Sequence, residues 1–274
     1  MSFVARHKSK AIRALAWVAG IVGGYLLVAY LTVPALWRHY EHQRKLDGLP
    51  MVTTTAQGIL GDPINIGVVG SKTDILCAMG KAGWVPADPV TFKSSLEISE
   101  SVALDRPYPK APVSNLYYTG RHQDLAFEKP AGGSADQRHH LRLWEVLKDG
   151  NEGRPVWLGA VTFDRSVGFS RYTGEVTHHI GPDIDLDRAL IEADLQKAGM
   201  IAARYQVTGI GPTLRGRNGG GDLYFTDGEV WVMWLVENCQ RRETPPSLLP
   251  SPPATQFKDT IWKSVADLYR RSQQ

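Results

Sequence analysis

Hydrophobic and polar positions divide this chain into an apolar N-terminal run and a long segment of mixed strand and helix patterns. The run from Ala14 to Trp37 holds 24 residues without a charged side chain. As a helix it spans about 36 Å, which exceeds the roughly 30 Å hydrocarbon core of a bilayer. We therefore predict a basic N-terminus at 1–13, a transmembrane anchor at 14–37 and a polar juxtamembrane spacer at 38–57.

Short apolar runs bounded by turn residues fill the following domain, 58–240. Strands outnumber helices there and mostly follow one another, and Asp227-Gly228 is a typical hairpin turn before the last strand. We predict an α+β fold, with a mostly antiparallel sheet and flanking helices, preceded by one N-terminal transmembrane helix. The expected strands are 64–69, 116–119, 125–128, 140–146, 156–163, 178–180, 201–207, 222–225 and 230–236; the expected helices are 72–82, 91–104 and 184–198.

The C-terminal part has a separate pattern. Segment 241–254 is rich in proline and reads as a stiff linker. Segment 255–272 predicts an amphipathic helix, whose apolar stripe contains Phe257, Ile261, Val265 and Leu268. Such a helix either packs on its own domain or lies on a membrane or a partner.

The apolar run could instead be a cleaved signal peptide. Its length exceeds the usual apolar core of about 7–15 residues, and no small-x-small cleavage site follows it. We therefore favour an uncleaved anchor. Basic residues in the first 13 positions favour a cytoplasmic N-terminus, which places the globular domain in the periplasm or otherwise outside the cytoplasm.

Charge is distributed unevenly along the chain. Residues 1–45 hold seven Lys and Arg and one acid, whereas the remainder holds 24 Lys and Arg and 27 acids. A nucleic-acid-binding module carries its basic patch on the folded domain. The slightly acidic domain therefore argues against a nucleic-acid partner, and the membrane lipid bilayer is the expected partner of the anchor.

Two cysteines, Cys77 and Cys239, are the only ones in the chain. A disulfide would be permitted outside the cytoplasm. Because Cys77 lies among apolar neighbours in an expected helix, we favour a buried free thiol.

Histidines and acids near residue 180 offer the strongest candidate chemistry. His178 and His179 are adjacent on an expected strand, so only one of them can face a given site. Asp183 and Asp185 follow at a helix N-terminus, and His140 lies on another strand. These five residues are candidate ligands of a divalent metal, and the catalytic candidates are His178, His179, Asp183 and Arg171. Alternatively, Asp183 or Asp185 caps the helix and the histidines form hydrogen bonds within the sheet.

A glycine-rich loop at 209–222 could bind an anion through backbone amides. It is not a P-loop, because Arg-Asn stands where Lys-Ser or Lys-Thr is needed and a strand follows it. The anion-binding candidates are Arg121, Arg217, Asn218 and Asp222; the alternative is a structural loop and Arg–Asp pairing.

Several uncommon strings together resemble the LssY C-terminal domain family across about residues 58–237. They are Gly61-Asp-Pro-Ile-Asn65, Arg106-Pro-Tyr-Pro109, Gly120-Arg-His-Gln-Asp-Leu-Ala-Phe127, Arg138-His-His140, Thr162-Phe-Asp164, Thr177-His-His-Ile180 with Pro182-Asp183, and Gly216-Arg-Asn-Gly-Gly-Gly-Asp222. The resemblance implies a bacterial, membrane-associated envelope protein. The family is named after a component encoded with a type I secretion system, and the resemblance implies no particular biochemical activity. The domain of this family also occurs fused to further membrane domains, and we expect none of the activities of those domains here.

The sequence thus predicts a single-pass protein of the bacterial inner membrane. Our leading interpretation is an envelope accessory or binding module, whose ligand is an envelope or secretion-related protein or an anionic lipid or glycan headgroup. The alternative is a metal-dependent hydrolase of a phosphorylated lipid or envelope substrate, in which Arg171 or Arg217 holds an anion beside a metal-activated water.

Overall fold

The computed structural model describes residues 2–33, 35, 46, 48–87, 116–131, 137–251 and 253–272. It contains two compact units, Met1–His42 and Gln43–Gln274, each of which is considered by itself. The helix expected at 91–104, the string at 106–109 and Trp37 lie outside the described residues.

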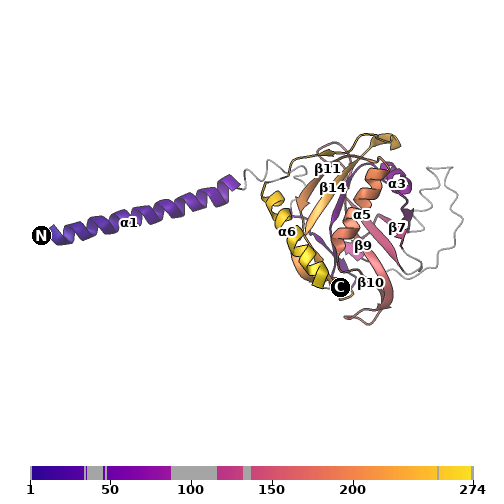
Figure 1. Ribbon diagram of the computed structural model, residues 1–274, viewed down its shortest axis with the longest axis horizontal. Coiled ribbons are helices and arrows are strands. Elements are labelled where there is room, and N and C mark those ends of the chain that lie inside the picture. Colours follow the sequence, from indigo (N-terminus) through magenta and orange to yellow (C-terminus); the bar gives the residue numbers. More distant parts are fainter. Residues whose placement is uncertain are drawn as a thin grey trace. The chain divides into compact units, whose positions relative to one another are not determined.

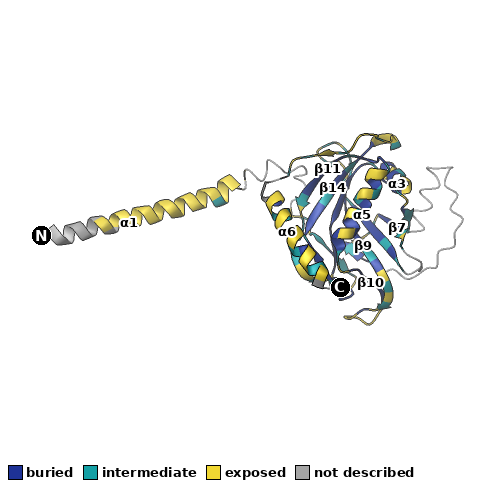
Figure 2. Ribbon diagram, viewed as in Figure 1, coloured by how far each residue is buried: buried dark blue, intermediate teal, exposed yellow. Residues whose placement is uncertain are grey.

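The first unit is a long helix. Helix α1 (Ser2–Leu27) continues into a π-helical turn, η1 (Val28–Thr32). Within it, Ile12–Thr32 has a mean hydropathy of 1.9 and no buried residue; the described part of its ribbon is coloured almost throughout as exposed in Figure 2. The chain therefore has one N-terminal helix that is long and apolar enough to cross a membrane.

The second unit is built on a large mixed sheet. Its strand order is β15-β11-β14-β3-β9-β8-β7-β4, and β10 pairs with β9. Among the strand pairs of the described residues, only β14–β3 and β11–β15 are parallel. The predicted α+β class with a mostly antiparallel sheet is confirmed. The strands are β3 (Ile66–Val69), β4 (Val85–Pro86), β7 (Leu125–Pro130), β8 (Arg138–Leu147), β9 (Val156–Phe169), β10 (Val176–Ile180), β11 (Ile201–Thr208), β14 (Glu229–Leu235) and β15 (Ser247–Leu248).

Two helices cover one face of this sheet (Figure 1). Helix α3 (Lys72–Lys81) begins at the expected cap, Ser71, whose hydroxyl accepts a hydrogen bond from the Asp74 backbone N–H in a capping box. Helix α5 (Ile184–Lys197) contributes Ile191 and Leu195 to the main core, and α3 contributes Met79. All three side chains are fully buried.

A second, smaller sheet contributes to the other core. It has the order β2-β1-β5-β6, formed by β1 (Val52–Thr55), β2 (Leu60–Pro63), β5 (Leu116–Tyr118) and β6 (Arg121–His122). Leu116 and Tyr118 pack with Trp144 and Leu158 of the large sheet. Strand β1 lies within the segment that was predicted from the sequence as a spacer. This Thr-rich segment forms a strand because it pairs with β5, which is far away in the chain.

The prediction of a hairpin between the last two strands at Asp227-Gly228 is wrong. Strand β13 (Leu223–Thr226) pairs with β12 (Thr213–Arg217) rather than with β14. Gly228 does adopt a positive φ, of 73°. Asp227 instead uses its carboxylate to accept hydrogen bonds from the Arg188 guanidinium at 2.8 and 2.6 Å. The segment is thus a corner between two sheets.

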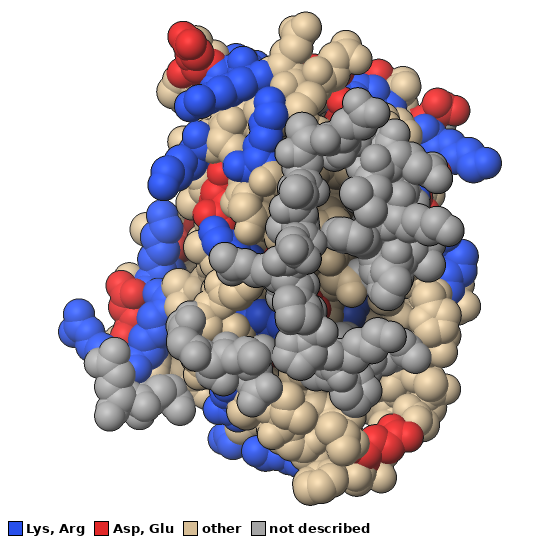
Figure 3. Space-filling view, turned by 90° about the vertical axis from the view of Figure 1, so that its right-hand side faces the viewer, with Lys and Arg blue, Asp and Glu red and all other residues tan. Residues whose placement is uncertain are grey.

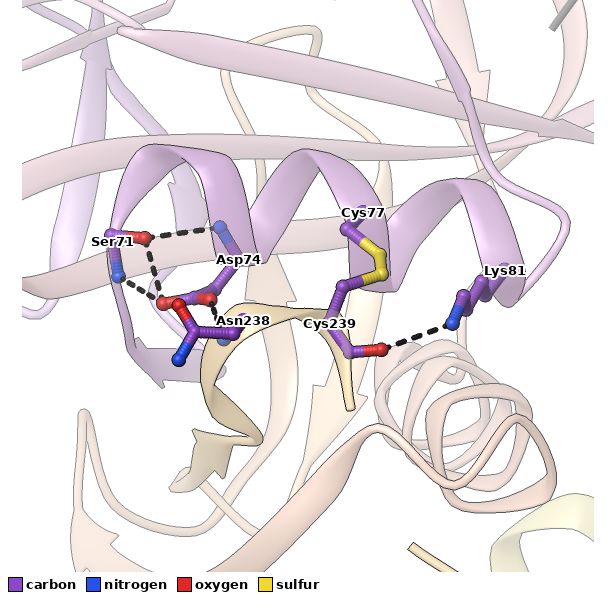
Figure 4. The surroundings of a disulfide bond; sticks show 6 residues. All are labelled: Ser71, Asp74, Cys77, Lys81, Asn238 and Cys239. Carbon is purple, nitrogen blue, oxygen red and sulfur yellow. Dashed lines mark hydrogen bonds between the residues drawn. A yellow bond between two sulfur atoms is a disulfide. The ribbon is translucent and has the colours of Figure 1, made fainter. Parts of the chain in front are cut away.

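The expected free thiols are also wrong, because Cys77 and Cys239 form a disulfide across a Cα–Cα distance of 6.0 Å (Figure 4). It joins α3 to the short helix η3 (Glu237–Cys239). Asp74 accepts a hydrogen bond from the Asn238 N–H at 3.0 Å, and Lys81 donates one to the Cys239 carbonyl at 3.1 Å. The bridge is therefore one of several contacts that fix η3 beside α3.

The C-terminal helix α6 (Pro253–Ser272) packs on its own domain. Arg270 donates to Asp183 at 2.7 Å, the Phe225 and Tyr269 rings meet at 4.8 Å, and Lys258 forms an ion pair with buried Glu229. The predicted apolar stripe points away from these contacts. Its residues Phe257, Ile261 and Leu268 are 69%, 50% and 68% exposed.

Candidate functional site

A polar pocket of about 430 Å³ lies where the two sheets, strand β10 and the glycine-rich loop meet. Its walls come from several separate parts of the chain, which is typical of a ligand site positioned by a rigid scaffold. The charged or amide side chains among its lining residues are Gln57, Asp62, Arg142, Asp164, Glu175, His178 and Asn218.

The floor of the pocket follows from strand periodicity. Arg138, His140 and Arg142 alternate along β8 with the core residues Leu141 and Leu143. Because side chains on a strand alternate between faces, the three polar residues share the face opposite to the helices. Farther along β8, that face is occupied by the core residue Trp144. The same sheet face therefore changes from apolar to polar toward the pocket.

Strand β9 supplies the central carboxylate of the site. The Asp164 Oδ2 atom lies 3.6 Å from His140 Nδ1 and 3.9 Å from His178 Nδ1, and its side chain is only 5% exposed. Burial raises the pKa of Asp164, but the neighbouring His140, Arg142 and His178 outweigh that effect and hold it below 3.8. Oδ2 is itself buried and faces the two imidazoles from beyond ordinary hydrogen-bond distance. Asp164 is thus an ionised acceptor with unused capacity.

Asp62 of β2 faces the same guanidinium from the other sheet. Its Oδ2 lies 3.6 Å from Arg142 Nη1, and its Oδ1 accepts a hydrogen bond from Asn218 Nδ2 at 3.3 Å. Burial raises the pKa of Asp62, opposed by Arg142 and assisted by the charge of Asp164. The two carboxylates beside one arginine are therefore unequal, with Asp164 the more acidic.

His178 is held in its neutral form. Its Nε2 lies 3.2 Å from the Arg138 guanidinium, which can only donate, so the imidazole accepts there and its proton lies on Nδ1, toward Asp164. Arg138 itself donates to Glu128 at 3.1 Å. Burial lowers the pKa of His178; Asp164 raises it, and Arg138 and Arg142 lower it further. Burial lowers the pKa of His140 as well, again with Arg142.

We expect His178 to titrate below pH 6.5 in an NMR pH series, and its midpoint to rise in an Arg138→Gln variant. The pKa of His178 in the folded protein lies below its unfolded value of 6.5. At pH values between these two pKa values, the unfolded chain therefore binds more protons than the folded one. Stability should therefore fall on acidification below pH 6.5, by up to about 1.4 kcal/mol per pH unit for each such histidine. A midpoint at or above 6.5 in the wild type would contradict this electrostatic description.

The segment predicted as a glycine-rich loop at 209–222 contains strand β12, and only residues 218–222 form the turn of the β12–β13 hairpin. Asn218 Oδ1 accepts hydrogen bonds from the Gly220 and Asp222 backbone N–H groups at 3.1 and 2.9 Å. Arg217 donates to the Gly221 carbonyl at 2.9 Å. An added Cβ at Gly219 would lie 2.5 Å from Thr55, so glycine permits the close approach of the two segments. Much of the loop's hydrogen-bonding capacity is used internally.

The predicted anion-binding residues do not gather at one point. Arg121 lies with Asp124 at 3.4 Å and donates to the Glu145 carbonyl, away from the pocket. Asp222 accepts from His179 Nδ1 at 2.9 Å and from the Ile180 N–H at 3.1 Å. Only Asn218 lines the pocket, and Arg171 contributes its backbone N–H to the Gly220 carbonyl.

The predicted metal and catalytic residues are split in the same way. His140 and His178 converge on Asp164, whereas His179 turns toward Asp222. Asp183 occupies the N-cap position of α5 without a capping hydrogen bond, because its carboxylate binds Arg270.

Asp185 accepts hydrogen bonds from Thr226 at 2.6 Å and from the Asp227 N–H at 2.9 Å. Within the described part of the chain, no group of three or more His, Cys, Asp or Glu residues is arranged to hold a metal ion.

Sequence reasoning missed Asp62, Arg142 and Asp164 as the centre of the site. A signal was present: polar residues recur at every second position in Arg138-x-His140-x-Arg142 and in Thr162-x-Asp164, within otherwise apolar strands. Such a pattern indicates a buried polar face.

Charges on the molecular surface are mixed. On the face shown in Figure 3, Lys and Arg side chains follow the left-hand edge, and Asp and Glu side chains lie among them. This face therefore carries both signs of charge.

The fold and the pocket together define an α+β domain with a buried polar site, in a chain that also has an apolar N-terminal helix. Residues 46–230 match the family model described as LssY C-terminus, and the chain belongs to that family. No curated protein and no solved structure matches the chain.

Proposed function

We propose that the protein is a membrane-anchored binding module of the bacterial cell envelope, whose pocket holds an uncharged, hydroxyl-rich ligand such as a saccharide headgroup. The observation that carries the proposal is Asp164. Its side chain lines the pocket and is ionised, with Oδ2 turned toward the Nδ1 atoms of His140 and His178 at 3.6 and 3.9 Å. An ionised carboxylate has about four acceptor positions, so it can also accept hydrogen bonds from a ligand in the pocket.

The donor and acceptor set favours hydroxyl groups over an anion. Asp62 and Asp164 are acceptors, Arg142 is a donor, and neutral His178 and Asn218 offer both. A sugar hydroxyl donates one hydrogen bond and accepts others, so it can pair with each of these groups. A phosphate would lie against two carboxylates with one guanidinium to balance them, which is unfavourable in a buried site.

Location at the outer side of a bacterial membrane is supported by two independent features. The apolar helix that ends at Thr32 follows a basic N-terminus, an arrangement that favours a cytoplasmic start. The Cys77–Cys239 disulfide is of a kind that persists in oxidising compartments such as the periplasm.

We expect an Asp164→Asn variant to lose saccharide affinity by about 10- to 100-fold, since a hydrogen bond to a charged group contributes about 1.5–3 kcal/mol. The measurement is calorimetric titration of the full chain in nanodiscs with methyl glycosides of glucose, galactose, mannose and N-acetylglucosamine, and with inorganic phosphate.

Asp124→Asn is the matched control, because Asp124 is a partly exposed carboxylate that does not line this pocket. Its affinity should equal that of the wild type. Binding of phosphate in place of every glycoside, or no binding at all, would overturn the proposal.

A further inference from the structure

Strands β9 and β10 continue beyond the large sheet as a two-stranded ribbon. Residues 166–169 of β9 have β10 as their only strand partner among the described residues, whereas its earlier residues pair with β8 and β3. In Figure 1 the end of this ribbon projects from the lower side of the domain. The turn at its tip, 170–175, contributes Ser170, Thr173 and Glu175 to the pocket lining. The ribbon is therefore one wall of the pocket.

Register places apolar side chains on the pocket face of this ribbon. Val176 pairs with Phe169, and His178 pairs with Val167. Directly paired residues point to the same side of a sheet, and so do residues two apart on one strand. Phe169, Val167 and Val176 thus share the face of His178. We call these three residues the apolar wall.

The apolar wall is exposed although it adjoins a polar site. Phe169 is 69%, Val176 48% and Val167 38% exposed, and Val176 itself lines the pocket. Contiguous exposed apolar side chains commonly mark a contact surface. A ligand that reached from Asp164 past His178 to Phe169 would meet polar groups first and apolar groups afterwards.

The proposed membrane anchor makes amphiphiles of the bilayer candidate ligands of this pocket. An amphiphile in the bilayer presents its polar headgroup outward and its apolar part toward the membrane. The change from polar headgroup to apolar tail in such a molecule matches the change from the polar pocket floor to the apolar wall.

We propose that the ligand is a membrane amphiphile, whose hydroxyl-rich headgroup occupies the polar floor and whose lipid portion contacts the apolar wall. This inference rests on the proposed function, since it assigns the same pocket a lipid-linked saccharide rather than a free one. The apolar wall then determines specificity for the lipid-linked form.

The test compares methyl and octyl glycosides of the same four sugars, below the micelle concentration, on residues 43–274. That unit is compact and contains its own cores, so it is suited to preparation without α1. We expect the octyl glycoside to bind at least about 10-fold more tightly than the methyl glycoside of the preferred sugar. A Phe169→Ser, Val167→Thr variant should lose that difference and keep the affinity for the methyl glycoside, because neither residue lines the pocket.

Phe257→Ser on α6 is the matched control, because Phe257 is also 69% exposed but does not line the pocket. It should leave both affinities unchanged. Equal affinity for the two glycosides would overturn the inference and leave the proposed function standing, whereas failure of both to bind would overturn both. An octyl preference that survives the Phe169→Ser, Val167→Thr change would refute the role of the apolar wall.

Discussion

Replacing Cys77 and Cys239 by serine is expected to lower the free energy of unfolding by about 2–5 kcal/mol. The disulfide joins residues separated by 162 positions. Closing so long a loop restricts the unfolded chain strongly, and the chain-entropy model gives about 5 kcal/mol as the upper figure. The measurement is denaturant unfolding of residues 43–274, compared with the wild-type unit with and without a reducing agent.

The single variants supply the control for this prediction. Cys77→Ser and Cys239→Ser should each be as unstable as the double variant, because either change alone removes the bridge. Reduced wild type should unfold at nearly the same denaturant concentration as the variants. If reduction leaves the wild-type midpoint unchanged, the two thiols are not bridged in the folded protein.

The disulfide was not predictable from the sequence because it depends on a parallel strand pair. Strand β14 runs parallel to β3 with Trp234 opposite Val69, so the C-terminal ends of the two strands lie side by side. Helix α3 follows β3 and η3 follows β14, which brings Cys77 and Cys239 together. Parallel pairing between segments so distant in the chain leaves no pattern in the local sequence. The apolar neighbours of Cys77 do form a local pattern, and they favoured the incorrect prediction of a free thiol.

Elements with strong local patterns were predictable for the opposite reason. Helix α3 has a capping box and β9 a long apolar run, and both signals depend only on neighbouring residues. Strands β1 and β12 were missed because each is short and is stabilised by a partner elsewhere, as in the pairing of Thr54 with Tyr117.

The histidines show the same division between local and long-range information. Strand alternation predicted that only one of His178 and His179 can face a given site. That prediction is confirmed, because His178 faces Asp164 while His179 faces Asp222. The acidic residue expected beside His178 was a different one from the residue found there. Asp183 is near in sequence, but Asp164 is near in space, since β9 pairs with both β8 and β10.

An Arg142→Met variant should be less stable than the wild type by about 3–5 kcal/mol at pH 7.5, and should lose saccharide binding. Arg142 is 7% exposed and lies between the carboxylates of Asp62 and Asp164. Methionine fills a similar volume without a charge, so both acids would be left buried and uncompensated. The measurement is chemical unfolding of residues 43–274 at pH 7.5 and pH 5.

The pH dependence separates charge from packing. Without Arg142, the pKa of Asp62, already raised by burial, rises further in the folded state, which then binds a proton that the unfolded chain does not. The variant should therefore recover part of its lost stability as the pH falls toward 5. Arg142 also lowers the pKa of His140 and His178, so its removal weakens their acid destabilisation and acts in the same direction.

Two further variants make the Arg142 prediction specific. Arg142→Lys keeps the positive charge and should retain much of the stability, although its ammonium cannot reproduce the planar donor set. Arg121→Met removes an arginine whose side chain is 49% exposed and pairs with Asp124, and should change stability by less than about 1 kcal/mol. A loss at Arg142→Met that is the same at pH 7.5 and pH 5 would mean that its aliphatic packing, rather than its charge between the two acids, stabilises the site.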